Sequence, residues 1–329
     1  MAIVMGLLAA VLASAPASIA PATAQLLPTV YEAGHFYAVP ETMDGQKLKL
    51  VVDTGGSGGG GMYVLLASTA KRLHLSTKPC PDGGGEVATL PRFKTGQSLP
   101  PLIAPACGQA AWVGPFDTLG AGYLPRRTWT FDYPNHRLRM EGSDWHPAPD
   151  AHKAPLGFPH KADGSLGDGL AAIEIKVDGQ TIPLLLDTGA TARPTVAGEK
   201  ASGTPTVNGE GVTSYITTSV LERWHKAHPE WRVVADGDDL LGPKRATRLI
   251  EVPDVEIAGW RVGPVWFTER PDRNFGIKGI SQYMDRIVSG SAGANIFQHF
   301  VMTLDYPHEA AWFRCVTGCK AVATPPPAP

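Results

Sequence analysis

The 329 residues of the chain are enough to build one large hydrophobic core or two of ordinary size. With 29 Lys and Arg against 31 Asp and Glu, the net charge is −2, so the chain lacks the basic excess of a protein that binds nucleic acid or an anionic membrane. Only 18% of the residues are charged, and the 37 Gly and 30 Pro favour many short strands joined by turns over long amphipathic helices.

The first 24 residues are predicted to be a signal peptide. An apolar stretch is followed by small residues and an Ala22-Thr23-Ala24 site, which predicts cleavage before Gln25. No Lys or Arg precedes the apolar stretch, so a buried N-terminal helix is the alternative. The stretch is too short and too interrupted by Pro to span a bilayer, and we expect an exported protein, periplasmic or secreted, with no stable membrane association.

The four cysteines fit an exported protein. Cys80 and Cys107 lie in the first half of the chain, and Cys315 and Cys319 form a C-x3-C pair near its end. Of the three possible connectivities, we expect sequential pairing because it keeps each bridge within one half. A zinc site is the competing interpretation, but the spacing is not that of paired C-x2-C knuckles, and we expect no metal.

The chain contains two copies of one unit. At an offset of 134, residues 39–56 align without a gap with residues 173–190, and each copy predicts a strand, an Asp-Gly-Gln turn, a second strand and an Asp-Thr-Gly triplet. At an offset of 173, residues 118–140 align with residues 291–313, and each predicts a glycine turn, a short helix and a strand that ends in Asp-Tyr-Pro. Two copies indicate a duplicated unit rather than a solenoid, which needs at least three repeats.

The repeats divide the chain into two lobes. We predict an N-terminal lobe at 25–145 and a C-terminal lobe at 169–319. The polar segment between them, rich in Pro and Gly, is predicted to be a linker at 146–168, and the Pro-rich end at 320–329 a disordered tail.

Between the aligned repeats, the sequence patterns that predict secondary structure are weaker. Residues 64–75 and 217–228 are predicted to be corresponding short helices. Residues 249–267 predict two strands joined by a turn at Ala258-Gly259. The second copy is longer than the first, and its extra segment 193–211 follows the second Asp-Thr-Gly directly, where a lid, a specificity loop or a plug is possible.

The doubled motif resembles the aspartic peptidases of the pepsin and retropepsin type, in particular exported single-chain relatives with lobes of retropepsin size. The residues that carry the resemblance are Asp53-Thr54-Gly55, Asp187-Thr188-Gly189, the downstream pairs Leu119-Gly120 and Ala292-Gly293, and the two Asp-Tyr-Pro strands. The resemblance covers residues 30–315 and implies a mainly β fold, with two pseudo-symmetric retropepsin-like β-barrel lobes and an active-site cleft between them.

The chemistry of peptide hydrolysis explains why the motif occurs twice. Water needs a base to take its proton, and the carbonyl oxygen of the peptide needs an acid. Two carboxyl groups about 3 Å apart cannot both ionise, so together they hold one proton and supply both functions. We therefore expect Asp53 and Asp187 to act as a catalytic pair on an extended peptide or protein substrate, in a monomer that needs no cofactor.

Residues beside the two aspartates are expected to support the loops. Gly55 and Gly189 allow a sharp turn where a Cβ would crowd the carboxyl groups. The resemblance implies that Thr54 and Thr188 hydrogen-bond between the lobes, and that Ser57 and Thr191 each donate to a carboxylate.

Other interpretations of these residues compete with the peptidase. Each Asp could simply cap a turn. Gly55-x-Ser57-x-Gly59 matches a serine hydrolase motif, but the following glycines oppose the helix that this motif needs. His225 and His228, and the acidic group Asp236, Asp238 and Asp239, lack the further ligands or spacing of a metal site and favour a solvated helix face and a polar turn.

The runner-up function is a catalytically silent peptide-binding protein that keeps the scaffold. The glycine-rich sequence 55–62 after the first Asp, and the absence of a clear flap over the cleft, motivate it. The turn-rich segments 82–86 and 236–242 are the candidate flaps, and neither has an aromatic residue of the pepsin kind nearby.

Overall fold

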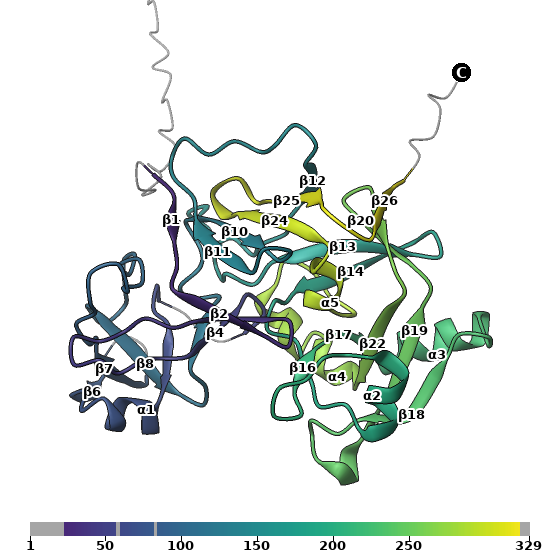
Figure 1. Ribbon diagram of the computed structural model, residues 1–329, viewed down its shortest axis with the longest axis horizontal. Helices are drawn as coiled ribbons and strands as arrows, with labels where there is room; N and C mark the ends of the chain where they lie inside the picture. The colour runs from purple at the N-terminus through teal and green to yellow at the C-terminus, as the bar shows by residue number, and fades with distance from the viewer. Residues whose placement is uncertain (1–22, 57–59, 82–83, 323–329) are drawn as a thin grey trace, which may run out of the picture.

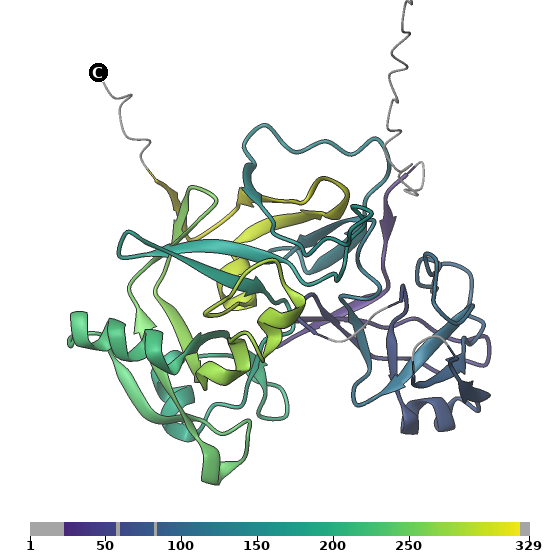
Figure 2. The same ribbon diagram turned by 180° about the vertical axis from the view of Figure 1, so that it is seen from behind.

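The computed structural model describes residues 23–56, 60–81 and 84–322 and is mainly β. Figure 1 shows two lobes side by side, the N-terminal one around β7, β8 and α1 and the C-terminal one around β18, β19 and α3, with a further sheet across the top of both. The same arrangement is seen from behind in Figure 2. The expected mainly β, two-lobed fold is therefore confirmed.

One eight-stranded sheet builds the N-terminal lobe. Its strand order is β2-β3-β4-β9-β5-β8-β7-β6. The strands are β2 (Thr29–Glu32), β3 (His35–Ala38), β4 (Leu50–Asp53), β5 (Val64–Leu66), β6 (Thr77–Pro79), β7 (Glu86–Thr89), β8 (Ala110–Gly114) and β9 (Thr118–Gly120), with helix α1 (Ala67–Arg72) after β5.

A ten-stranded sheet builds the C-terminal lobe, in the order β18-β19-β22-β17-β23-β14-β13-β20-β21-β26. The strands are β13 (Ala172–Val177), β14 (Gln180–Leu186), β17 (Ser214–Thr217), β18 (Val233–Asp238), β19 (Thr247–Val252), β20 (Val255–Ile257), β21 (Trp260–Val262), β22 (Val265–Arg270), β23 (Gly290–Ala292) and β26 (Cys319–Ala321). The helical elements of this half are α2 (Val196–Ser202), α3 (Thr218–Ala227), α4 (Asp272–Phe275), α5 (Ala294–Phe297) and the 3-10 turns η1 (Pro243–Arg245), η2 (Ile280–Tyr283) and η3 (Tyr306–His308).

A six-stranded sheet joins the two lobes, in the order β1-β11-β10-β24-β25-β12. Its strands are β1 (Gln25–Leu26), β10 (Thr128–Asp132), β11 (Arg137–Met140), β12 (His152–Pro155), β24 (Phe300–Asp305) and β25 (Ala310–Cys315). The two Asp-Tyr-Pro strands, β10 and β24, are antiparallel neighbours at its centre.

The pseudo-twofold axis passes through this central pair. Thr130 and Thr303, which the repeat aligns at an offset of 173, lie directly opposite each other, and their hydroxyl oxygens are 2.8 Å apart. Because equivalent residues face each other across the seam, the two halves of the duplication are related by a rotation about this point.

The strands around each Asp-Thr-Gly follow the same pattern in both lobes. In the first, β9 pairs in parallel with β4 and antiparallel with β5, and β5 pairs in parallel with β8. In the second, β23 pairs in parallel with β14 and antiparallel with β17, and β17 pairs in parallel with β22. The repeat in the sequence is therefore a repeat of topology.

Two details differ from the expected lobes. Among the described residues, each large sheet runs from one edge strand to another, β2 to β6 and β18 to β26, so the lobes are open sheets and not the β-barrels we expected. Residues 64–66, expected at the start of a helix, form β5, because their backbone pairs with β8 and the helix begins only at Ala67.

Some of the other predicted elements are present and two are not. The short helix expected after the glycine turn is α5 in the second copy, but in the first copy residues 121–127 form only turns. The strand expected before the Asp44-Gly45 turn is reduced to isolated bridges at Glu41 and Thr42. The Asp-Gly turn at 178–179 joins β13 to β14, the turn at Ala258-Gly259 joins β20 to β21, and α3 spans Thr218–Ala227. Most buried apolar strand residues of both lobes and of the shared sheet belong to one cluster, and a smaller second cluster includes Ala172 of β13 and Leu185 of β14. That continuity fixes the lobes against each other, since burying apolar surface is the main stabilising contribution in folding.

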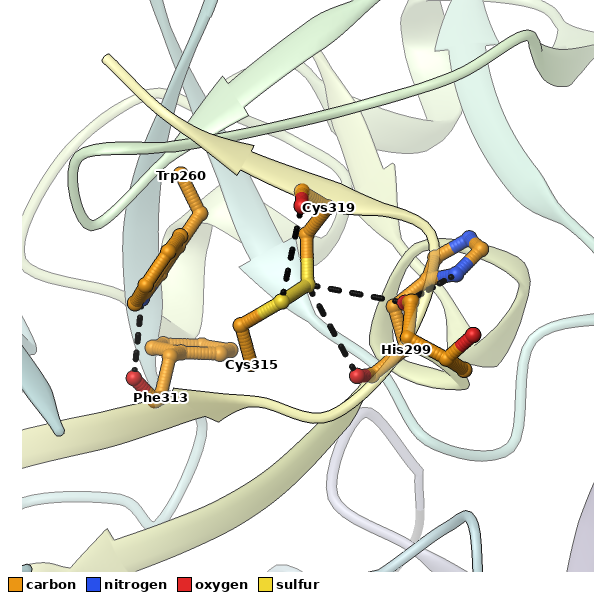
Figure 3. Close-up of a disulfide and its surroundings, with 6 residues drawn as sticks. Trp260, His299, Phe313, Cys315 and Cys319 are labelled. Carbon is orange, nitrogen blue, oxygen red and sulfur yellow. Dashed lines mark hydrogen bonds between the residues drawn. A yellow bond between two sulfur atoms is a disulfide. The ribbon is translucent and has the colours of Figure 1, made fainter. Parts of the chain in front are cut away.

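Both disulfides join the expected partners, Cys80 to Cys107 and Cys315 to Cys319. Figure 3 shows the second one, which closes a tight turn between β25 and β26 beside His299. The sulfur of Cys319 lies 3.9 Å from the His299 carbonyl oxygen, and the Trp260 indole donates a hydrogen bond to the Phe313 carbonyl next to it (3.0 Å).

The ends of the predicted lobes carry some sheet structure of their own. Strand β12 lies within the segment predicted to be a linker and pairs with β25. Lys320 and Ala321, predicted to begin the disordered tail, pair with β21 instead, because the disulfide returns the chain to that strand. The signal peptide, apart from its last two residues, and the tail after residue 322 lie outside the described residues, and the lobe boundaries stay predictions.

Among the described residues, none of the helices has the length and the apolar character that crossing a membrane requires.

Candidate functional site

The two Asp-Thr-Gly loops leave the lobes at equivalent places. Strand β4 alternates buried and half-buried residues and ends at Asp53, which lies opposite Gly120 of the parallel strand β9. Strand β14 ends in a fully buried run, and the next residue, Asp187, donates its N–H to the Ala292 carbonyl of β23 (2.9 Å). Parallel neighbours on one side of each strand thus fix both aspartates at the seam.

Four hydrogen bonds lock the two loops together. The Thr54 hydroxyl donates to the Leu186 carbonyl (2.8 Å) and accepts from the Thr188 N–H (3.0 Å). The Thr188 hydroxyl donates to the Val52 carbonyl (2.7 Å) and accepts from the Thr54 N–H (3.1 Å). These are the bonds between lobes that we expected, and each half of the network is the image of the other about the pseudo-twofold axis.

Each carboxyl group lies against the glycine of the opposite loop. A Cβ added to Gly55 would lie 2.4 Å from Cγ of Asp187, and one added to Gly189 would lie 2.3 Å from Cγ of Asp53. Any side chain at either glycine would collide with a carboxyl group, because real Cβ contacts are longer than 3.0 Å. The absence of a Cβ is therefore what lets the two acids approach each other.

Backbone N–H groups orient both carboxyl groups. The Gly55 N–H donates to Oδ1 of Asp53 (3.0 Å) and the Gly189 N–H donates to Oδ1 of Asp187 (3.2 Å). Asp53 is half-buried and Asp187 is buried, with 7% of its surface exposed.

Burial dominates the electrostatics of the pair. It raises the pKa of Asp53, while a hydrogen bond from Asp187 and the nearby N–H groups lower it. Burial raises the pKa of Asp187 well above its ordinary value, and the charge of Asp53 raises it further. Two acids in hydrogen-bonding reach of each other, both with raised pKa, do not readily ionise together, so the pair is suited to hold one proton.

Ser291 on β23 also faces this pair, a contact that we did not predict. Its buried hydroxyl lowers the pKa of Asp187 and has no other hydrogen-bond partner among the described residues. The repeat places Thr118 at the position equivalent to Ser291. In both copies a hydroxyl residue directly precedes the apolar residue and glycine of the downstream pair, and this shared hydroxyl is the sequence signal that could have identified Ser291.

Thr191 does not bond to a carboxyl group, contrary to expectation. The Thr191 hydroxyl donates its hydrogen to the Gly189 carbonyl (2.8 Å), so this hydrogen is not donated to Asp187. The same hydroxyl oxygen lies 3.1 Å from Nε2 of His35. Its backbone is clamped by Tyr215, whose hydroxyl accepts from the Thr191 N–H (2.9 Å) and donates to the Thr191 carbonyl (2.5 Å). Ser57, the equivalent residue of the first loop, lies outside the described residues.

His35 holds the second loop from the other lobe. It follows the turn between β2 and β3, is 3% exposed, and its ring lies within hydrogen-bonding reach of the backbone of Gly189 and Ala190. Burial lowers the pKa of His35, although those backbone contacts raise it. We did not identify His35 from the sequence, which gives no sign that a histidine after an Ala-Gly turn reaches the other lobe.

The extra segment 193–211 adds to the contacts between the second loop and the N-terminal lobe. It carries α2 between the short strands β15 (Thr191–Ala192) and β16 (Gly211–Val212), which pair with each other. The Val212 N–H donates to the Ala33 carbonyl at the tip of the β2–β3 hairpin (3.2 Å), and a Cβ on Gly34 would lie 2.4 Å from Cγ2 of Val212. The N-terminal lobe thus contacts the extra segment of the C-terminal lobe on one side of the pair.

The candidate metal residues do not form a metal site. Among the residues that the structure describes, no three His, Cys, Asp or Glu side chains are grouped to hold an ion. Nε2 of His228 lies 3.0 Å from a carboxyl oxygen of Asp178. The buried Asp238 accepts a hydrogen bond from Arg270 (3.0 Å), and the Arg270 guanidinium lies 4.3 Å from the centroid of the Tyr215 ring. The prediction of a polar turn is wrong for Asp236 and Asp238, which belong to strand β18, and through Arg270 the buried Asp238 supports the tyrosine that holds Thr191.

No family model and no curated protein matches the sequence. Among solved structures, the chain is similar to an aspartic proteinase from Irpex lacteus, at 12% identity and a TM-score of 0.44 over 90% of this chain and 98% of that one. It is also similar to the basic 7S globulin from soybean, at 12% identity and a TM-score of 0.41 over 89% of this chain and 95% of that one. A third similar structure is conglutin gamma, a basic 7S globulin from lupine seeds, at 10% identity and a TM-score of 0.41 over 89% of this chain and 95% of that one.

At TM-scores below 0.5 we draw no functional conclusion from these matches. The resemblance to the pepsin and retropepsin type lies in the chain's own features: two lobes of repeated topology, a six-stranded sheet between them, and two Asp-Thr-Gly loops in contact on the axis.

Proposed function

We propose that this chain is an aspartic-type endopeptidase that hydrolyses peptide bonds with a water molecule activated between Asp53 and Asp187. The observation that carries the proposal is the contact of each carboxyl group with the glycine of the opposite loop, which brings two acids with raised pKa within hydrogen-bonding reach of each other. Neither lobe contains this pair alone, which gives the duplication a chemical purpose.

The pair supplies an acid and a base to the same peptide bond. The ionised carboxylate takes a proton from water as the water oxygen attacks the carbonyl carbon, and the protonated carboxyl donates to the carbonyl oxygen. In the second step the C–N bond breaks, the amine nitrogen takes a proton from the pair, one hydroxyl of the tetrahedral intermediate returns a proton to the pair, and a carboxylic acid remains. The reaction needs no other cofactor, because both proton transfers are assigned to these two side chains.

The substrate in this proposal is an extended peptide or protein segment that lies between the lobes and pairs with exposed backbone as an added strand. Export fits the two disulfides, since such bonds persist in oxidising compartments, and we propose a periplasmic or secreted monomer.

Asp53→Asn and Asp187→Asn, made separately, test the proposal. Each should lower the rate of cleavage of a mixed peptide library by roughly 10²–10⁴-fold or more between pH 3 and 8, because each removes one half of the acid–base pair. Asp150→Asn, an exposed carboxylate outside the seam, is the control and should cleave like the wild type.

Two results would count against the proposal. Activity that survives in either variant would reject the pair as the catalyst. A wild type that binds statine-type peptides but cleaves nothing in the library would favour the silent peptide-binding protein instead.

A further inference from the structure

A hollow lies beside the first Asp-Thr-Gly loop. It has a volume of ≈230 Å³ and is lined by Gly55, Gly56, Ala121, Asp168, Leu170, Ile280 and Tyr283. Gly55 orients the Asp53 carboxyl group through its N–H, and the Ala121 N–H holds the Gly56 carbonyl (3.0 Å). The hollow is therefore adjacent to the reacting groups of the proposed enzyme.

Asp168 is the acidic group of this hollow. It is half-buried, and its carboxyl group receives hydrogen bonds from the backbone N–H groups of Gly169 and Leu170. Burial raises its pKa, and no ion pair within 4.0 Å joins it to a basic side chain of the described residues. A partly desolvated carboxylate without a cationic partner is costly unless a ligand supplies one.

Two basic residues share a second hollow with Asp168. This hollow has a volume of ≈250 Å³, shares Ala121 and Asp168 with the first, and is also lined by Arg126 and Lys161. No charge interaction from either of these side chains contributes to the pKa of Asp168. The inner hollow therefore keeps an acidic character.

The remaining walls suit a long side chain with a charged end. Leu170 and Ile280 are apolar, and the Tyr283 ring, 51% exposed, forms part of the lining. Lys and Arg side chains bury an aliphatic stem and keep a cationic head, which an aromatic face also attracts. The combination of one carboxylate with aliphatic and aromatic walls matches that shape better than a small or acidic side chain.

We propose that Asp168 makes this hollow a substrate subsite for the cationic side chain of a Lys or Arg close to the cleaved bond. This inference rests on the proposed peptidase function and adds the substrate preference of that same site. Asp168 is a specificity residue here and takes no part in the proton transfers.

Matched peptides test the charge preference. Each position on either side of the cleaved bond would carry Lys, norleucine or Glu in turn, and kcat/KM would be measured for the wild type, Asp168→Asn and the control Asp163→Asn. Asp163 is an exposed carboxylate of the same segment that bonds to Ser165 and does not line either hollow.

At one position, the wild type should prefer Lys to norleucine. Asp168→Asn should lower kcat/KM for that Lys peptide by about 10- to 100-fold, the usual range for a hydrogen bond to a charged group, and change the norleucine peptide by about two-fold at most. Asp163→Asn should keep the wild-type preference, and Asp168→Lys should shift it towards Glu. Equal losses for Lys and norleucine peptides in Asp168→Asn, or no loss, would overturn the proposal.

A binding measurement separates this inference from the proposed function. Calorimetric titration of Asp187→Asn, with and without Asp168→Asn, against the Lys and norleucine peptides measures the preference without turnover. A Lys preference that disappears with Asp168 supports the subsite even if the wild type cleaves nothing, and equal dissociation constants for both peptides reject it.

Discussion

The two Asp-Thr-Gly loops are alike up to the glycine and unlike after it. Both carry a threonine that bonds across the seam and a glycine that makes room for the opposite carboxyl group. The loop after Asp187 then continues into Thr191, which His35 and Tyr215 hold, and into the extra segment with α2. The loop after Asp53 instead borders an open hollow with an acidic wall.

The difference between the two loops reflects two separate requirements, sharing a proton and binding a peptide. Sharing a proton demands the same approach from both sides, so the residues that position the carboxyl groups are duplicated. A peptide substrate has no twofold symmetry, so the surfaces on either side of the pair are free to differ. We therefore expect changes in the duplicated part to have large and similar effects, and changes in the divergent part to have smaller and one-sided effects.

The largest effect is expected from a methyl group at either glycine. Gly55→Ala and Gly189→Ala should each lower peptide cleavage by roughly 10²–10⁴-fold, because the new Cβ displaces the opposite carboxyl group and disables the acid–base pair. Gly276→Ala is the control, since its φ is −68° and its nearest contact would be an ordinary 3.4 Å. A loss in only one of the two variants would contradict the symmetry of the site.

The threonines should give the next largest effect, on stability. Thr54→Val and Thr188→Val each leave a buried carbonyl and a buried N–H without their partners, which should lower the free energy of unfolding by about 2–4 kcal/mol in both cases. Urea unfolding measures this. Thr130→Val, which removes one side chain bond on the same axis, should cost less, and unequal losses at Thr54 and Thr188 would show that the network is not symmetric in energy.

The pH dependence of stability tests the shared proton. In the folded state the pKa of Asp187 is raised, so its protonated form stabilises the fold at acid pH, and that contribution is lost as pH rises through the raised pKa. Asp187→Asn cannot ionise, so its stability relative to the wild type should increase between pH 4 and pH 8, by about 1.4 kcal/mol for each unit by which the pKa is raised. Parallel stability curves for the two proteins would contradict a raised pKa.

The smallest effect is expected where the turn between β2 and β3 contacts Val212, beside the two aspartates. Gly34 and Gly45 have almost the same backbone conformation, with φ of +88° and +87°, but a Cβ meets Val212 only at Gly34 and nothing within 4 Å at Gly45. Gly34→Ala should therefore destabilise the chain by about 1–3 kcal/mol more than Gly45→Ala in thermal or urea unfolding. Equal losses would mean that the β2–β3 hairpin does not press on Val212 of β16.

Much of this arrangement could be predicted because it is written in local patterns. Apolar strands that end in Asp-Thr-Gly, Asp-Gly turns at hairpins and the two aligned repeats indicated two lobes, the paired aspartates and the bonds between Thr54 and Thr188. The two disulfide pairs followed from keeping each bridge within one half.

The tertiary structure alone decided which distant groups reach these loops. His35 and Asp168 stand in stretches with no special pattern, and the repeat marks Ser291 only as a hydroxyl residue equivalent to Thr118. Thr191 uses its hydroxyl on the backbone of its own loop instead of on a carboxylate. Periodicity and turn residues report the conformation of neighbours along the chain, whereas these contacts depend on how two finished lobes dock. The sequence by itself determined the two acids and their glycines, and the docking of the lobes decided what surrounds them.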